Sequence, residues 1–330
     1  MSVTKCCDRQ IKSFLMTEFQ RIRGVLAPVV TPFDERLNPD VMRFISHCKW
    51  LLSQNCGLAI FGTNSEGNSL SVEEKIELLD AVVAAGVDTH RMMPGTGCCA
   101  LTDTVRLTER VVRAGCACAL MLPPFYYKNV SDDGLYRSYA EVIERVGDTR
   151  LRVYIYHIPQ VSGVGVPVGV IERLIKSYTT AIAGIKDSSG DWTHTQTLLE
   201  TFSGPDFDVF VGSESFLLAN MTNGGVGCIS ATANVNPAAI DELYRRWNEP
   251  DAESRQDELN TVRAIVGIHG MIPSLKAVIA HFTRHPGWAN VRPPLDRLTA
   301  EAAADLTARL RDLHFTMPGI IYSHEIHAGL

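Results

Sequence analysis

The chain has 330 residues, 45% of them hydrophobic and 21% charged, and a formal net charge of −6. This composition excludes disorder for most of the chain, because there is enough apolar surface to form a core. No stretch approaches the roughly 18 uncharged apolar residues of a membrane span, so no membrane partner is expected. The acidic balance argues against nucleic-acid binding, which needs a basic face.

The first 22 residues are expected to form an N-terminal extension, since residues 1–20 lack the apolar stretch and cleavage site of a signal peptide. The nine cysteines do not have the Cys-x-x-Cys spacing of a zinc ribbon. Free and mostly buried thiols in a reducing compartment are the simplest interpretation, and a cytoplasmic location is expected.

Eight short apolar runs follow along the chain, and we expect them to be strands. Most are uncharged and end in Gly, Pro, Thr or Ser, which is typical of strands buried on both faces of a parallel sheet. They cover residues 24–30, 57–62, 92–95, 117–122, 151–157, 181–186, 209–212 and 227–230.

Helical patterns lie between these runs. Ser71 and Glu74 form a capping-box pattern at the start of one helix, which is expected to end near Gly86. Another helix is expected to begin at Ser131, with acidic residues in its first turn.

The alternation of strands and helices predicts an α/β protein with a (β/α)8 TIM barrel over residues 23–234. The alternative is a doubly wound open sheet, but the glycine-rich turn that usually follows its first strand is missing. Helical patterns without strands follow at 238–247, 251–266, 274–282 and 300–314. They predict a C-terminal helical region over residues 235–315, followed by a tail over 316–330.

In a barrel of this type, functional groups lie where the strands end. Lys186 follows an apolar run, and inside the barrel its amine would be desolvated and able to attack a carbonyl. A lysine that leaves the strand into solvent is an equally good interpretation of this motif alone. Alternation places Tyr154 and Tyr156 on one face of the preceding strand and His157 on the other. A phenol beside an amine can relay protons, although a core tyrosine is the more frequent case.

Two further strand ends carry polar or aromatic side chains. The loop 63–67 can present successive backbone N–H groups to a carboxylate, although an ordinary polar loop is the more frequent case. Tyr126 and Tyr127 suit a pocket wall or a subunit contact. His324 and His327 lack the spacing of a zinc motif, and no metal site is expected.

Together these residues resemble the pyruvate-dependent class I aldolase superfamily of dihydrodipicolinate synthase and N-acetylneuraminate lyase. The matching stretches are 62–67 (Gly-Thr-Asn-Ser-Glu-Gly), 156–159 (Tyr-His-Ile-Pro) with 162–163 (Ser-Gly), and 184–186 (Gly-Ile-Lys). The Tyr-x-x-Pro stretch, followed thirty positions later by the lysine of Gly-x-Lys, is the specific part of the pattern.

The resemblance implies that Lys186 forms a Schiff base with the keto carbon of a small-molecule 2-keto acid, with no cofactor. Tyr156 would position the substrate and relay protons, and Thr63 would link Tyr156 to an aromatic hydroxyl from a neighbouring subunit. Tyr126 matches that aromatic best and Tyr127 is the alternative. A shared tyrosine would require at least a dimer, and the resemblance implies a homotetramer built from two dimers.

The substrate contacts are implied in the same way. Backbone N–H groups of Thr63 and Asn64, beside Ser65, would hold the substrate carboxylate, and Ile229 would line the same end. The rest of the substrate would lie against Ser188, Gly212 and Glu214.

The chain departs from the family pattern at three places. Asn64 and Ser65 replace the usual Thr-Gly, so either the serine adopts a backbone angle that suits glycine or the loop has shifted. Val161 stands where synthases usually carry an arginine for the carboxylate of the aldehyde substrate, and valine cannot form that ion pair. His157 replaces a common asparagine and is expected to face away from the Schiff base in a structural role.

The leading hypothesis is an enzyme, a Schiff-base lyase or aldolase that cleaves, condenses or dehydrates pyruvate or a 2-keto-3-deoxy sugar acid. One alternative is a true 4-hydroxy-tetrahydrodipicolinate synthase, which Val161 disfavours. Another is a non-catalytic 2-keto acid binder, suggested by the altered loop. A metal-dependent aldolase would need a ligand cluster that the sequence does not convincingly contain.

Overall fold

The computed structural model describes residues 21–202 and 204–320, in which seven strands form one parallel sheet. The strands are β1 (Gly24–Ala27), β2 (Gly57–Leu58), β3 (Ala119–Met121), β4 (Val153–His157), β5 (Ile182–Asp187), β6 (Asp208–Val211) and β7 (Gly227–Ile229). Their spatial order is β2-β1-β7-β6-β5-β4-β3, so β7 returns to lie beside β1. This cyclic order differs from the reversal of order that defines a doubly wound sheet.

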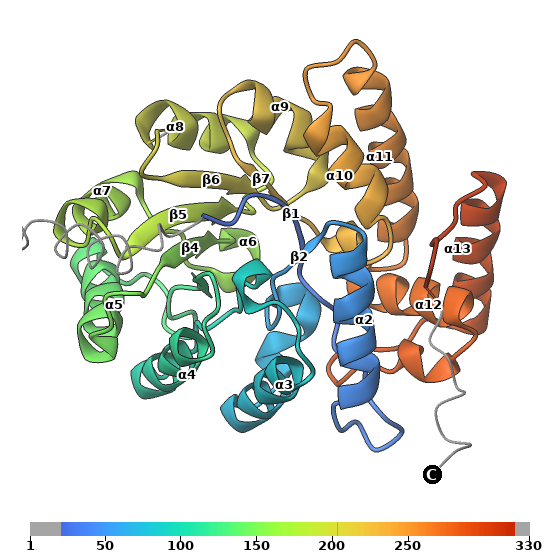
Figure 1. Ribbon diagram of the computed structural model, residues 1–330, viewed down its shortest axis with the longest axis horizontal. Helices are drawn as coiled ribbons and strands as arrows, with labels where there is room; N and C mark the ends of the chain where they lie inside the picture. Colours follow the sequence, from blue (N-terminus) through green and yellow to red (C-terminus); the bar gives the residue numbers. More distant parts are fainter. Residues whose placement is uncertain (1–20, 203, 321–330) are drawn as a thin grey trace, which may run out of the picture.

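Residues 92–96 connect the two edges of this sheet. The amide of Met93 donates to the carbonyl of Leu58 in β2 (2.8 Å), and the amide of Leu120 in β3 donates to the carbonyl of Pro94 (2.9 Å). Isolated parallel bridges reinforce both contacts. Because Pro94 has no N–H to donate, this predicted strand joins its neighbours through bridges rather than a continuous ladder. The sheet therefore curls back on itself (Figure 1).

Helices lie around the curled sheet and extend beyond it on one side (Figure 1). They are α2 (Val41–Ser53), α3 (Val72–Ala84), α4 (Leu101–Arg113), α5 (Asp132–Val146), α6 (Pro159–Ser162), α7 (Val168–Ser177), α8 (Trp192–Phe202), α9 (Leu217–Thr222), α10 (Pro237–Arg245), α11 (Ala252–Gly267), α12 (Met271–Thr283) and α13 (Ala300–Asp312). The predicted capping box is confirmed, because Ser71 and Glu74 each accept the other's backbone N–H at the start of α3. Ser131 caps α5 as predicted.

Apolar side chains fill two spaces, one inside the curled sheet and one between the sheet and its helices. Strand alternation decides which side chain enters which space. On β4, Tyr154 and Tyr156 belong to the inner cluster and Ile155 belongs to the outer one. The predicted alternation on this strand is therefore confirmed.

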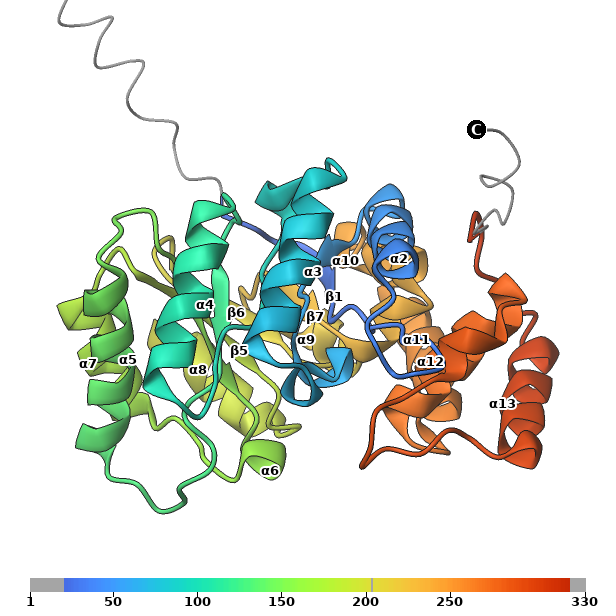
Figure 2. The same ribbon diagram turned by 90° about the horizontal axis from the view of Figure 1, so that it is seen from below.

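Helices α11, α12 and α13 gather at one side of the molecule, beyond α2 and α10, in both views (Figure 1, Figure 2). They match the predicted helical patterns after residue 250, and α10, which precedes them, packs against β1. In the ranges that the structure describes, no individual helix is long and apolar enough to cross a bilayer. The pair α11 and α12 meets that measure together, across a bend of 99°.

Free thiols are confirmed for the seven cysteines in the described residues. Cys48, Cys56, Cys118 and Cys228 are buried, and burial raises the pKa of each thiol, so they are protonated and unreactive. The extension before residue 21 and the histidines at 324 and 327 lie outside the described residues.

Candidate functional site

Lys186 lies on β5 with its side chain pointing into the protein and only 2% exposed. It pairs in register with Tyr156 on β4 and with Phe210 on β6. Its Nζ lies 4.1 Å from the centroid of the Tyr156 ring. The structure therefore excludes the interpretation that Lys186 leaves its strand into solvent, and it brings an amine and a phenol together at the ends of two adjacent strands.

Thr63 joins this pair from the loop after β2. The Thr63 Oγ1 and the Tyr156 hydroxyl are 3.2 Å apart and share a hydrogen bond. Thr63 and Asn64 open the 3-10 helix η1 (Thr63–Ser65), so their backbone N–H groups have no acceptor within that helix. These two amides are therefore available to an anion that approaches beside Thr63.

The loop takes its left-handed turns at residues other than Ser65. Phe61 (φ 64°) and Glu66 (φ 54°) hold the left-handed conformation. Gly67 occupies the tightest place, because a Cβ there would lie 2.1 Å from the carbonyl oxygen of Phe61. Serine therefore does not need the conformational freedom of glycine here. Ser65 is fully buried, and its Oγ has no hydrogen-bond partner among the described residues.

Glu66 ties this loop to the C-terminal helices. Its carboxylate forms an ion pair with Lys276 of α12, and both side chains are inaccessible to solvent. The amide of Arg292 donates to Glu66 Oε2 (2.8 Å), and Lys276 donates to the carbonyl of Asn290 (2.6 Å). Burial lowers the pKa of Lys276 to about 8, against the opposing effect of Glu66. The sequence analysis missed this pair, whose only signal is a lysine in the otherwise apolar run of α12.

The ends of β6 and β7 carry further residues that were expected to contact substrate. Gly212 lies against Ser188, since a Cβ at position 212 would meet the Ser188 Oγ at 1.9 Å. The small size of Gly212 is therefore what allows the Ser188 side chain to occupy the space between the two strand ends. Ile229 is the last residue of β7, and its side chain belongs to the inner cluster.

Glu214 lies in the short 3-10 helix η4 (Glu214–Phe216) after β6, and its side chain is buried. Its carboxylate accepts hydrogen bonds from the hydroxyls of Ser230 and Thr232, and it forms an ion pair with Arg263 Nη1 of α11 at 2.8 Å. The carboxylate is thus already engaged. Arg263, whose side chain is 25% exposed, is the more accessible partner of this ion pair, and the sequence analysis missed it.

Tyr126 and Tyr127 lie apart from this group. Both are 74% exposed, and their rings contact each other edge to face with centroids 5.3 Å apart. In the part of the chain that the structure describes, the Thr63 hydroxyl bonds to Tyr156 and to neither of these tyrosines. Large exposed aromatic side chains of this kind suit contact with another chain.

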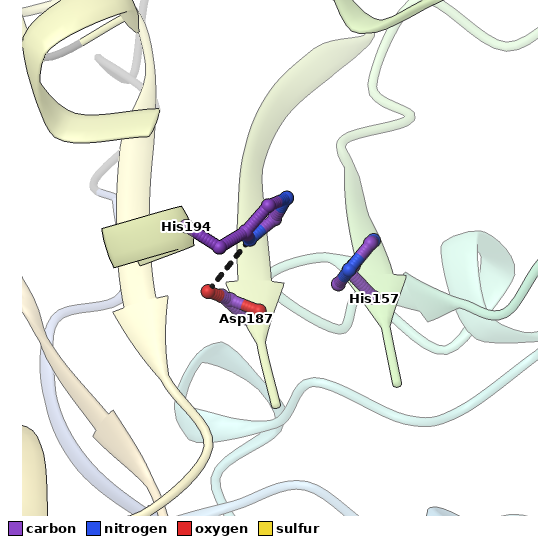
Figure 3. Close-up of side chains that lie close together, drawn as sticks. All are labelled: His157, Asp187 and His194. Atoms are coloured by element: carbon purple, nitrogen blue, oxygen red, sulfur yellow. Dashed lines mark hydrogen bonds and ion pairs between the residues drawn. The ribbon is translucent and has the colours of Figure 1, made fainter. Parts of the chain in front are cut away.

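A second polar cluster lies on the outer side of β4 and β5 (Figure 3). His157 and Asp187 are the last residues of these strands, and His194 comes from α8. Asp187 accepts hydrogen bonds from His194 Nδ1 (3.0 Å) and Thr195 Oγ1 (2.6 Å), and from the amide and hydroxyl of Ser189. The rings of His157 and His194 are stacked, with centroids 4.4 Å apart and planes inclined by 15°.

The contacts decide how this cluster is protonated. Burial lowers the pKa of His157 to about 4, and its Nδ1 accepts the amide N–H of Val166 (3.1 Å), so the ring is neutral. The hydrogen bond to Asp187 raises the pKa of His194. Burial raises the pKa of Asp187, but the hydrogen bonds from His194 and Thr195 outweigh it and hold that pKa below its ordinary value.

The potential ligand atoms of His157, Asp187 and His194 lie within 4.8 Å of one another, which by distance alone would allow a metal ion. Imidazole lone pairs lie in the plane of the ring, so two stacked rings cannot both direct a nitrogen at one ion. The Asp187 carboxylate also accepts four hydrogen bonds already. This geometry favours a hydrogen-bonded cluster that braces the ends of β4 and β5.

Comparison with known proteins identifies the family. A model described as the dihydrodipicolinate synthetase family matches residues 21–313. The chain belongs to this family. An uncharacterised DapA-like lyase of Chloroflexus aurantiacus is 32% identical to this chain over 293 residues, which cover 87% of this chain and 95% of the Chloroflexus protein.

Solved structures agree with this assignment to the dihydrodipicolinate synthetase family. The dihydrodipicolinate synthase of Agrobacterium tumefaciens matches with a TM-score of 0.82 at 28% identity, covering 88% of this chain and 99% of that one. A variant 2-keto-3-deoxygluconate aldolase of Sulfolobus solfataricus matches with a TM-score of 0.79 at 22% identity, covering 88% and 96%, and supports the fold. The predicted family is confirmed, and the protein is an enzyme, a lyase or aldolase of this family.

Proposed function

We propose that this enzyme forms a Schiff base between Lys186 and the keto carbon of pyruvate or a 2-keto-3-deoxy sugar acid. The observation that carries the proposal is the buried Lys186 amine over the Tyr156 ring, with the Tyr156 hydroxyl bonded to Thr63. The amine adds to the keto group and water leaves, which gives an iminium ion.

In the cleavage direction, the bond between C3 and C4 of the sugar acid breaks and its electron pair enters the iminium to form an enamine. The C4 hydroxyl loses its proton and becomes the carbonyl of the released aldehyde. Protonation of the enamine at C3, followed by hydrolysis, then frees pyruvate and regenerates Lys186. In this proposal Tyr156 relays the protons, because its ring lies against the Lys186 amine and its hydroxyl bonds to Thr63. The protonated imine polarises the substrate, so the proposed reaction uses no cofactor and no metal.

The assembly we propose is a homotetramer made of two dimers. Tyr126 of a second copy, or alternatively its Tyr127, would reach Thr63 and extend the relay. Two observations support this proposal: the two tyrosines are 74% exposed, and the Thr63 hydroxyl has a second lone pair open to a further donor.

The substrate contacts that we propose follow from the strand ends. The backbone N–H groups of Thr63 and Asn64 hold the carboxylate, beside Ser65 and with Ile229 at the same end. The distal part of the substrate lies toward Ser188, Gly212 and Glu214. Val161, which is 61% exposed and apolar, offers no charge to an aldehyde carboxylate, so we favour a sugar-acid lyase over a 4-hydroxy-tetrahydrodipicolinate synthase.

The finer description of the fold is also a proposal. We infer a (β/α)8 barrel over residues 23–234, supported by the closure of the curled sheet through residues 92–96. The C-terminal helical region would cover residues 235–315, and a cytoplasmic location would keep the free thiols reduced.

Borohydride trapping tests the proposed function. The protein is incubated with pyruvate, reduced, and digested for peptide mass spectrometry. We expect an adduct on Lys186 that is absent in Lys186→Ala and present in the control Lys176→Ala, which changes an exposed lysine of α7. An adduct on another lysine, or none with pyruvate or longer 2-keto acids, would overturn the proposal and favour the non-catalytic binder. Retained turnover in a chelator would separate it from a metal-dependent aldolase.

A further inference from the structure

A basic cavity lies at the amino-terminal end of the sheet. Its volume is about 830 Å³, which is in the range of sites for small metabolites. Its wall comes mainly from segments 21–23, 88–91, 115–117 and 149–152, which lie just before β1, the 92–96 segment, β3 and β4. Parallel strands begin at one face and end at the other, so this cavity is on the face opposite to the strand ends that carry Lys186.

The wall of this cavity carries an excess of positive charge. Asp88 is its one acidic residue among those that the structure describes, whereas five are arginines: Arg21, Arg23, Arg91, Arg150 and Arg152. Two more carboxylates stand close by, since Asp208 pairs with Arg21 and Arg23, and Asp148 pairs with Arg150. Among the described residues, five guanidinium groups thus face three carboxylates, in a chain whose formal net charge is −6.

Two of these arginines meet at Asp208, the first residue of β6. Arg21 and Arg23 share the single carboxylate of Asp208, at 3.3 and 3.2 Å, and that carboxylate also accepts the Tyr154 hydroxyl (2.5 Å). Arg152 adds a third cation, and burial together with the charge of Arg21 lowers its pKa. One shared carboxylate carries a single negative charge against the two guanidinium groups of Arg21 and Arg23, so an anion that enters beside them meets a net positive charge.

Several guanidinium groups of the wall use only part of their N–H groups in contacts with the described residues. Within the described ranges, Arg23 bonds to Asp208 through Nη2, and Arg91 bonds to the carbonyl of Leu52 through Nη1. Arg150 uses Nε and Nη2 for Asp148, which leaves its Nη1. Planar guanidinium groups match the oxygen pairs of phosphates and carboxylates. We propose that this cavity binds a small polyvalent oxyanion, a metabolite with two or more phosphate or carboxylate groups.

Calorimetric titration of the full chain tests this site independently of the lyase chemistry. The probes are inorganic pyrophosphate and citrate, each in metal-free buffer with sodium chloride at matched ionic strength. We expect saturable binding of one anion per chain and a higher melting temperature with the anion present. Tighter binding of pyrophosphate would identify a phosphate ligand, and tighter binding of citrate would identify a carboxylate ligand.

The double variant Arg91→Gln/Arg150→Gln should weaken this binding by about tenfold or more, since each lost charge-assisted hydrogen bond matters in a partly enclosed site. Neither arginine pairs with buried Asp208, so the core is retained. The control Arg309→Gln/Arg311→Gln removes the same charge from α13 and should leave binding unchanged. Absence of saturable binding with both probes, or equal weakening in the control, would overturn the proposal. Pyruvate trapping at Lys186 should be the same in both variants.

Discussion

Replacing Glu66 with glutamine should be among the most destabilising single changes in this protein. The carboxylate of Glu66 and the ammonium group of Lys276 are both excluded from solvent, so neither can exchange its partner for water. Breaking a buried ion pair by neutralising one member costs about 3–5 kcal/mol, because the other charge stays buried without compensation. Glutamine keeps the shape and one acceptor for the amide of Arg292, so we expect the lower half of that range.

Urea unfolding followed by intrinsic fluorescence measures this cost as a change in the free energy of unfolding. Glu73→Gln is the matched control, because Glu73 lies on α3 in an exposed pair with Arg106 and should cost less than about 1 kcal/mol. The double variant Glu66→Gln/Lys276→Met should lose clearly less than the sum of the two single variants, since it buries no unpaired charge. A Glu66→Gln protein within about 1 kcal/mol of the wild type, or additive single effects, would refute the reasoning.

Three further outcomes follow from the site. Burial lowers the pKa of His157 to about 4, so unfolding takes up a proton between about pH 6.5 and 4, and the free energy of unfolding falls as the pH falls through this range. His157→Asn should reduce this dependence by about 1.4 kcal/mol per pH unit, measured by urea unfolding at several pH values. Thr63→Val should slow borohydride-trapped imine formation by about tenfold to a hundredfold by removing the partner of Tyr156. Ser65→Ala should change the free energy of unfolding by less than about 1 kcal/mol, since it removes an unpartnered buried hydroxyl.

Each of these outcomes has its own control. An unchanged pH slope in His157→Asn would show that its ring is not held neutral by burial. Thr63→Ser retains the hydroxyl and should trap pyruvate at nearly the wild-type rate; if it is as slow as Thr63→Val, the hydrogen bond to Tyr156 is not the cause. A loss of several kcal/mol in Ser65→Ala would mean that the Ser65 hydroxyl has a partner in solution.

Local patterns located seven of the eight predicted strands, and residues 92–95 form only isolated bridges. Local patterns also predicted two helix caps and the direction of several side chains. The alternation along β4 correctly separated Tyr156 from His157, because the direction of a side chain in a strand depends on its position alone. The apolar run before Lys186 left burial and exit into solvent equally open, and the structure decides for burial. The capping box of Ser71 and Glu74 was predicted correctly because both partners lie within one helical turn.

Pairings between distant segments could not be predicted in this way. Glu66 and Lys276 are separated by 210 positions, and nothing in either segment points to the other. Arg263 reaches Glu214 from α11, in a helix whose pattern carries no sign of a site. The sequence also left two alternatives for the loop, and the structure has its left-handed angles at Phe61 and Glu66 and not at Ser65. These features depend on tertiary packing, which a single sequence does not display.

The ion pair between Glu66 and Lys276 can form only after α12 has been synthesised. A nascent chain that has emerged through α10 already contains every strand of the sheet, and domains begin to fold from the amino terminus during synthesis. At that stage Glu66 has neither Lys276 nor the amide of Arg292 as a partner. The loop that carries Thr63 and Asn64 can therefore be locked in its final shape only after Lys276 and Arg292 have been made, so a product that stops after α10 would contain every strand of the sheet but have an unanchored loop beside Lys186.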